Sequence, residues 1–137
     1  MAFRKVNMEL AAEQTVAPEG EYRIAVGKVT AKRSKKGADM DVLLLRFVDH
    51  PEYAPFSHFV VYPKPDDEEE KVRLMSRNMR RLCHLFEVPM TEEGFDSEDF
   101  SGAEAVCGIV VEKYEPEDGS EPREQNKLRL PRVPDEE

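Results

Sequence analysis

Seven basic residues gather in the first third of the chain, on a predicted β-hairpin. They are Arg23, Lys28, Lys32, Arg33, Lys35, Lys36 and Arg46. Four of them flank Ser34 in a turn that ends at Gly37, and glycine supplies the positive φ that such a turn needs. Cations at this density attract the phosphates of a nucleic acid. We therefore predict phosphate contacts here; the alternative is an ordinary solvated hairpin tip.

Aromatic side chains occupy a predicted strand at residues 56–62. Phe56, His58 and Tyr62 share one parity of this strand, whereas Phe59 has the other. Unpaired bases stack on exposed aromatic rings, and each such stack contributes about 1–3 kcal/mol. The three rings of shared parity are thus predicted to form a stacking surface beside the cations. The alternative is that they belong to the hydrophobic core.

The basic residues are positioned by two long strands, the first of which is bent. Apolar and polar residues alternate with period two over 20–26, as on a half-buried strand. Past Gly27 the apolar positions change parity, which predicts a β-bulge. The second strand, 40–48, has apolar residues on both parities, and we expect it to be covered on both faces at its centre.

Three further strands and one helix follow. The third strand covers 56–62, the fourth 104–114 and the fifth 126–130. Between the third and fourth strands, apolar residues with a period of 3.6 predict a long helix that ends at Val88 and Pro89. This β-β-β-α-β-β order is that of the five-stranded OB-fold barrel. We expect a mainly β domain over 18–133, an N-terminal arm over 1–17 and a short acidic tail over 134–137.

Composition restricts the class of protein. The net charge of −9 argues against a wholly basic nucleic-acid binder, so the distribution of charge matters more than its sum. No apolar run approaches the ~20 residues that span a bilayer, and the N-terminal sequence has no apolar signal core. We therefore expect no membrane partner and a cytoplasmic location. Cys83 and Cys107 lie on apolar stripes and are predicted to be buried thiols.

Several motifs, in this order and spacing, resemble those of a known family. The motifs are Pro18 to Tyr22, the lysine-rich turn ending at Gly37, Arg80 to Pro89, Asp99 to Gly102, and Pro122-Arg123 leading to Asn126. Over residues 18–133 the chain resembles the single-stranded DNA-binding proteins of tailed bacteriophages and related phage proteins. The resemblance implies an OB fold that binds single-stranded DNA. One departure is the acidic tail, which lacks the apolar tip found in bacterial relatives of such proteins.

The resulting expectation is a non-enzymatic protein that binds single-stranded DNA with little sequence preference. It would act in phage DNA replication, recombination or repair, in contact with replication or recombination proteins, in the cytoplasm of a bacterial host. The alternative is an OB-fold protein-interaction module, a phage accessory or structural protein that does not bind nucleic acid. No catalytic residue, metal site or cofactor is expected, because His50, His58 and His84 are scattered and no phosphate-loop glycine pattern occurs.

Overall fold

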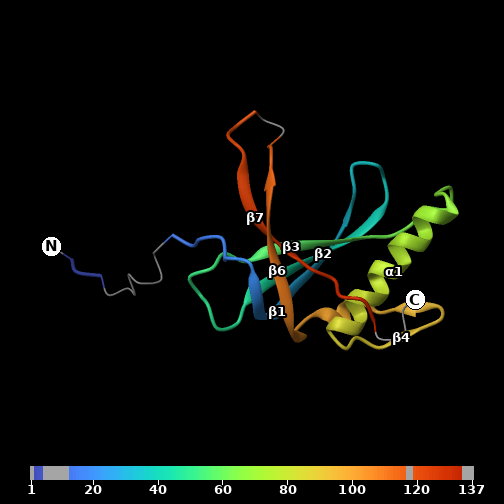
Figure 1. Cartoon of the computed structure of the whole chain (residues 1–137), viewed down its shortest axis with the longest axis horizontal. Coiled ribbons are helices and arrows are strands. Elements are labelled where there is room, and N and C mark those ends of the chain that lie inside the picture. The colour runs from blue at the N-terminus through green and yellow to red at the C-terminus, as the bar shows by residue number, and fades with distance from the viewer. Residues whose placement is uncertain (1, 5–12, 117–118, 134–137) are drawn as a thin grey trace.

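A five-stranded antiparallel sheet organises the protein (Figure 1). The computed structural model describes residues 2–4, 13–116 and 119–133. The strands lie in the spatial order β3-β2-β1-β6-β7. Their bounds are β1 (Gly20–Arg33), β2 (Asp39–Phe47), β3 (Phe56–Val61), β6 (Glu104–Tyr114) and β7 (Arg123–Leu128).

The helix α1 (Glu69–Leu85) follows β3 along the chain, and the predicted mainly β fold with a long helix after the third strand is therefore confirmed. After α1 come a small hairpin and a 3₁₀ helix over Ser97–Phe100. The hairpin consists of β4 (Met90–Thr91) and β5 (Gly94–Phe95). No helix within the described ranges is both long enough and apolar enough to cross a membrane.

The sheet is not a closed barrel. The edge strands β3 and β7 approach each other, but no ladder of backbone hydrogen bonds joins them within the described residues. Side chains meet at this seam instead, where Lys127 of β7 lies close enough to His58 of β3 to influence its ionisation. The predicted five-stranded barrel is therefore not confirmed, since the sheet curls but keeps two edges.

The predicted bulge at Gly27 is confirmed. The pairing of β1 with β2 shifts register between Val26 and Val29, so two residues of β1, Gly27 and Lys28, stand opposite Leu44 alone. Before the bulge, β1 pairs with β6 on its other side, from Gly20 to Ala25. A bulge bends its strand and increases the local twist. The bent β1 thereby connects the β2-β3 half of the sheet to the β6-β7 half.

The core lies on the inner face of the curled sheet, where part of α1 packs against it. Among its fully buried side chains are Ile24, Leu43, Leu45, Leu82, Phe100 and Ile109. The prediction that β2 is covered on both faces is wrong, because Leu44 is 42% exposed. Its neighbours Leu43 and Leu45 point into the core, and pleating directs Leu44 to the opposite, open face.

The two cysteines are free, buried thiols, as predicted. Burial disfavours the thiolate and raises the pKa of Cys83 to about 11 and that of Cys107 to about 12. Both thiols are therefore protonated at neutral pH, which makes them poor nucleophiles.

The chain enters the sheet through a short segment bound to two distant elements. Thr15 forms an isolated parallel bridge with Tyr53. Ala17 is buried; its N–H donates to Asn126 Oδ1 and its carbonyl accepts from Asn126 Nδ2, both at 2.9 Å. The end of the predicted arm thus belongs to the folded domain, whereas residues 5–12 of the arm and the tail 134–137 lie outside the described residues.

Candidate nucleic-acid interface

The face of β1, β2 and β3 that points away from the core is the candidate site, and we call it the outer strand face. Pairing places Thr30, Val42 and Phe59 side by side across it. Two residues farther along the β1-β2 ladder, Lys32 lies opposite Met40. Toward the other end of this ladder, Arg46 lies opposite Ala25. Its residues are Lys28, Thr30, Lys32, Val42, Leu44, Arg46, Ser57 and Phe59.

The centre of the outer strand face is apolar and open to solvent. Phe59 is 58% exposed, and Leu44 on the neighbouring strand is also exposed. Val42 is paired with Phe59 and lies two residues before Leu44 on β2, and its side chain is half-buried. An exposed ring held on a strand is a suitable platform for a flat, unpaired base.

Four of the seven predicted cations have no ion pair with any residue that the structure describes. They are Lys28, Lys32, Lys36 and Arg46. Two of the remaining three cations have a carboxylate partner. Arg23 Nη1 lies 4.0 Å from Glu104, and Arg33 Nε lies 3.6 Å from Asp39. Three of the four unpaired cations lie on the same face as the exposed ring of Phe59: Arg46 on the neighbouring strand β2, and Lys28 and Lys32 on β1, the strand beyond it.

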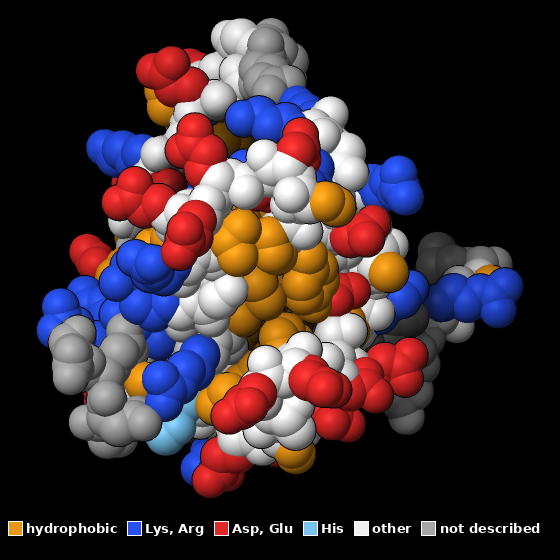
Figure 2. Space-filling model, turned by 90° about the vertical axis from the view of Figure 1, so that its right-hand side faces the viewer, with side chains coloured by type: hydrophobic (Ala, Val, Ile, Leu, Met, Phe, Trp, Pro, Cys, Tyr) orange, Lys and Arg blue, Asp and Glu red, His pale blue; other side chains and the backbone are white. Residues whose placement is uncertain are grey.

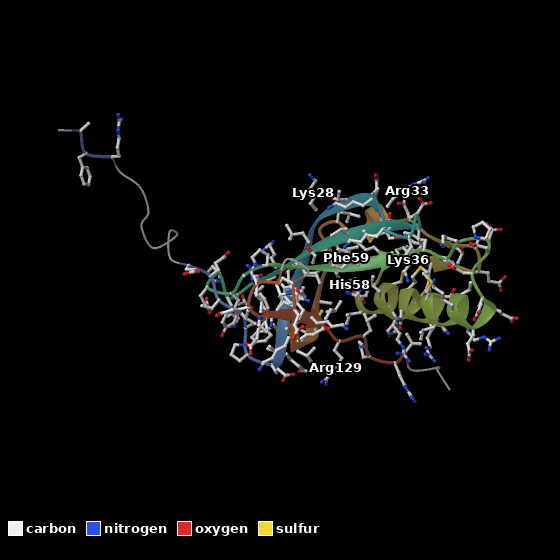
Figure 3. The ribbon with its side chains drawn as sticks, turned by 90° about the horizontal axis from the view of Figure 1, so that it is seen from above. Lys28, Arg33, Lys36, His58, Phe59 and Arg129 are labelled. Atoms are coloured by element: carbon white, nitrogen blue, oxygen red, sulfur yellow. The ribbon has the colours of Figure 1, made fainter. Side chains whose placement is uncertain are left out.

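The hairpin tip that carries Lys35 and Lys36 is a defined turn. The N–H of Ser34 donates to the carbonyl of Ala38 at 2.8 Å, and the N–H of Ala38 donates to Ser34 Oγ at 3.0 Å. Gly37 has a φ of 84°, the positive value for which glycine was predicted. Lys28 and Arg33 project from one side of the sheet, whereas Arg129 lies on the opposite side (Figure 3).

The three aromatic residues predicted to stack do not lie on this face. Phe56 and His58 are paired with Leu45 and Leu43, whose side chains are buried, so both point inward. Phe56 packs against Phe47, with ring centroids 5.6 Å apart. Tyr62 contacts the core and donates its hydroxyl to Asp41 at 2.6 Å. The structure therefore places three of the predicted cations, Lys28, Lys32 and Arg46, on the outer strand face, but none of the predicted aromatic residues.

Phe59 is the functional candidate that the sequence interpretation missed. A signal was present: Phe56, Val60 and Tyr62 make their parity of β3 the more apolar one, and the more apolar parity faces the core. The remaining parity, with Ser57 and Phe59, must then face solvent. Phe59 is thus an aromatic ring that the fold exposes on the outer strand face, the face that also carries Lys28, Lys32 and Arg46.

Comparison with protein-family models and with curated proteins finds no match to this sequence. Within the ranges that the structure describes, no three His, Cys, Asp or Glu side chains are grouped so that they could hold a metal ion.

His58 gives the fold a pH dependence. Burial disfavours its imidazolium and Lys127 repels it, and together they lower the pKa of His58 from 6.5 to about 4. Between these values the unfolded chain binds more protons than the folded one, so stability falls as the pH falls. Relative to His58→Gln, we expect the wild type to lose about 2 kcal/mol between pH 7 and pH 5. Urea unfolding of both proteins at the two pH values measures this, and parallel losses would refute it.

Proposed function

We propose that this protein binds single-stranded DNA on the outer strand face, without catalysis and with little sequence preference. The observation that carries the proposal is that an exposed Phe59 on β3 shares one face of the sheet with the unpaired cations Lys28 and Lys32 of β1 and Arg46 of β2. Phosphates would contact the cations, and bases would stack on the ring. This combination of a positive surface and an aromatic platform is the general requirement for binding a single strand.

The fold supports the same proposal. The strand order, the helix after β3 and the close approach of β3 and β7 are the features of an OB fold whose barrel is left open. OB folds commonly bind oligonucleotides through the surface of their second and third strands. The sequence motifs point to phage single-stranded DNA-binding proteins, and we place the proposed activity in phage DNA replication, recombination or repair.

The proposed site favours single strands over duplexes. A ring on the surface of a strand can stack on a base only when that base is unpaired and unstacked from its neighbours. A duplex would offer the cations its phosphates but would offer Phe59 no base face. The acidic residues elsewhere on the protein, which has a net charge of −9, oppose loose electrostatic binding of a duplex.

A direct comparison of strands tests the proposal. Fluorescence anisotropy of a labelled oligothymidine of about 30 nucleotides is measured beside a duplex of equal length, at low salt. We expect the single strand to bind at least tenfold more tightly, because stacking contributes only there. If neither oligonucleotide binds, the proposed function is wrong, and the interaction-module alternative replaces it.

Phe59→Ala tests the stacking residue. Removing the ring is expected to weaken single-strand binding by about 10-fold, within the 1–3 kcal/mol that one base stack contributes. Phe59→Trp should keep the affinity within about threefold, because it retains a flat aromatic face. Leu74→Ala is the matched control, since Leu74 is 49% exposed but lies on α1. Equal losses for Phe59→Ala and Leu74→Ala, measured by the same anisotropy titration, would exclude a stacking role.

A further inference from the structure

A second candidate site lies at the α1 end of the molecule, away from the outer strand face. It is a hollow of about 920 Å³ between the end of β3, one side of α1 and the β4-β5 hairpin. Figure 2 views this end and shows hydrophobic side chains gathered in an open depression. The volume falls within the range typical of ligand-binding pockets. None of the residues that line the hollow belongs to the outer strand face.

Two side chains in the lining of the hollow, Tyr62 and Cys83, are neutral. Tyr62 lines it, and the tyrosine hydroxyl already donates to the carboxylate of Asp41 at 2.6 Å. Burial and the nearby Asp41 carboxylate raise the pKa of Tyr62 well above its usual value, so the phenol stays neutral. Cys83, also in the lining, is a buried and protonated thiol. Next to these two side chains a charged occupant would find no counter-charge, whereas an apolar side chain would lose nothing there.

The walls of the hollow include apolar side chains, two of which are unbranched methionines. Met79 of α1 and Met90 of β4 face the hollow together with Phe95. Met90 is 40% exposed, which leaves a large apolar side chain in contact with water. Unbranched thioether side chains adapt to irregular partners, and surfaces that bind varied peptides are rich in methionine. Covering Met90 with an apolar side chain would remove its hydrophobic surface from water, which is favourable.

The rim of the hollow is mainly acidic. Glu92 and Glu93 lie at the turn of the β4-β5 hairpin and line the hollow, with Arg80 of α1 across from them. Acidic side chains surround much of the depression in Figure 2. This charge repels the phosphates of a nucleic acid or of an anionic lipid surface. It attracts lysine or arginine residues that flank an apolar side chain.

We infer that the hollow is a docking site for a segment of a partner protein in which an aliphatic or aromatic side chain is flanked by basic residues. The apolar anchor would occupy the space between Met79, Met90 and Phe95. The flanking cations would lie against Glu92 and Glu93. Because the hollow shares no residue with the outer strand face, this inference does not depend on the proposed binding of DNA.

The probe is a synthetic peptide, Lys-Lys-Leu-Phe-Lys-Lys, added to the full chain labelled with ¹³C in its methionine methyl groups. We expect the methyl signals of Met79 and Met90 to shift, and that of Met40, which is on the outer face of β2, to stay unchanged. The peptides Glu-Glu-Leu-Phe-Glu-Glu and Lys-Lys-Ser-Ser-Lys-Lys should each bind at least tenfold more weakly. The first lacks the charge that the rim selects, and the second lacks the apolar anchor.

Variants separate docking at the hollow from general attraction to an acidic protein. The double substitution Glu92→Lys and Glu93→Lys should weaken the peptide at least tenfold. The matched control, Glu121→Lys with Glu124→Lys, makes the same charge change before and within β7 and should keep the affinity within twofold. Lys28→Glu with Lys32→Glu should also leave peptide binding unchanged, even if DNA binding fails.

Three results would overturn the inference. One is equal binding of the basic and acidic peptides, and another is the absence of methyl shifts at millimolar peptide. The third is a shift of Met79 and Met90 with protein concentration alone, which would assign the hollow to a second copy of the chain.

Discussion

Reversing Lys28 and Lys32 to glutamate is expected to weaken single-strand binding by about 100-fold at low salt. Each substitution removes one phosphate contact and places a negative charge where a phosphate would lie. Neither lysine is paired with a carboxylate of the described residues, so the substitutions break no ion pair within that part of the protein. The two side chains are exposed, and the fold should be retained. Anisotropy of labelled oligothymidine measures the loss at one fixed salt concentration.

A matched variant on α1 separates the local effect from the net charge. Lys71→Glu with Arg77→Glu changes the net charge by the same −4 as the pair on the sheet, since each substitution replaces +1 by −1. Both residues are exposed on α1, and Lys71 differs from the sheet lysines in that its Nζ lies 3.3 Å from Asp67 Oδ1. We expect this variant to keep its affinity within about threefold, because it lies outside the proposed contact and is partly screened by salt. If the two variants lost affinity equally, general electrostatics would explain binding and the outer strand face would have no special role.

Replacing Asn126 by leucine is expected to destabilise the fold by about 3 kcal/mol. Asn126 is 6% exposed, and its side-chain amide satisfies both the N–H and the carbonyl of Ala17 at 2.9 Å. Leucine has a similar size but no polar atoms, and the buried peptide groups of Ala17 would lose their partners. Each unsatisfied buried group costs about 1–3 kcal/mol. Urea unfolding of the variant and the wild type measures the difference.

The neighbouring Gln125 supplies the control for this prediction. It lies on the same strand, β7, but is exposed, so Gln125→Leu should change stability by less than about 0.5 kcal/mol. A loss below about 1 kcal/mol for Asn126→Leu would mean that water or a rearranged segment satisfies Ala17. The anchoring of residues 15–17 to the sheet would then not depend on Asn126.

Local patterns in the sequence predicted the features that depend on neighbours in the chain. The change of parity at Gly27 predicted the bulge, because adding one residue to a strand necessarily moves its apolar side chains to the other parity. The run over 104–114 predicted β6 with the bounds that the structure has. Period-3.6 spacing placed α1 between β3 and β6, and the positive φ of Gly37 followed from its place in a tight turn.

Features that depend on long-range pairing were not predictable in this way. Aromatic residues occupy both parities of β3, and only its register against β2 decides that His58 points inward and Phe59 outward. Apolar residues on both parities of β2 similarly suggested two covered faces, although Leu44 is 42% exposed. Whether β3 and β7 close a barrel depends on residues some 60 positions apart, which no local period encodes.

The central claim is that the unpaired cations of the outer strand face, with Lys36 at the hairpin tip, bind the phosphates of a single strand, and the salt dependence of binding tests it most directly. Anisotropy titrations of labelled oligothymidine are made over a series of salt concentrations. The four cations Lys28, Lys32, Lys36 and Arg46 predict that log affinity falls with log salt with a slope of about −3, at about −0.7 for each phosphate contacted. An affinity that does not change with salt, or no measurable binding at the lowest salt concentration, would contradict the claim.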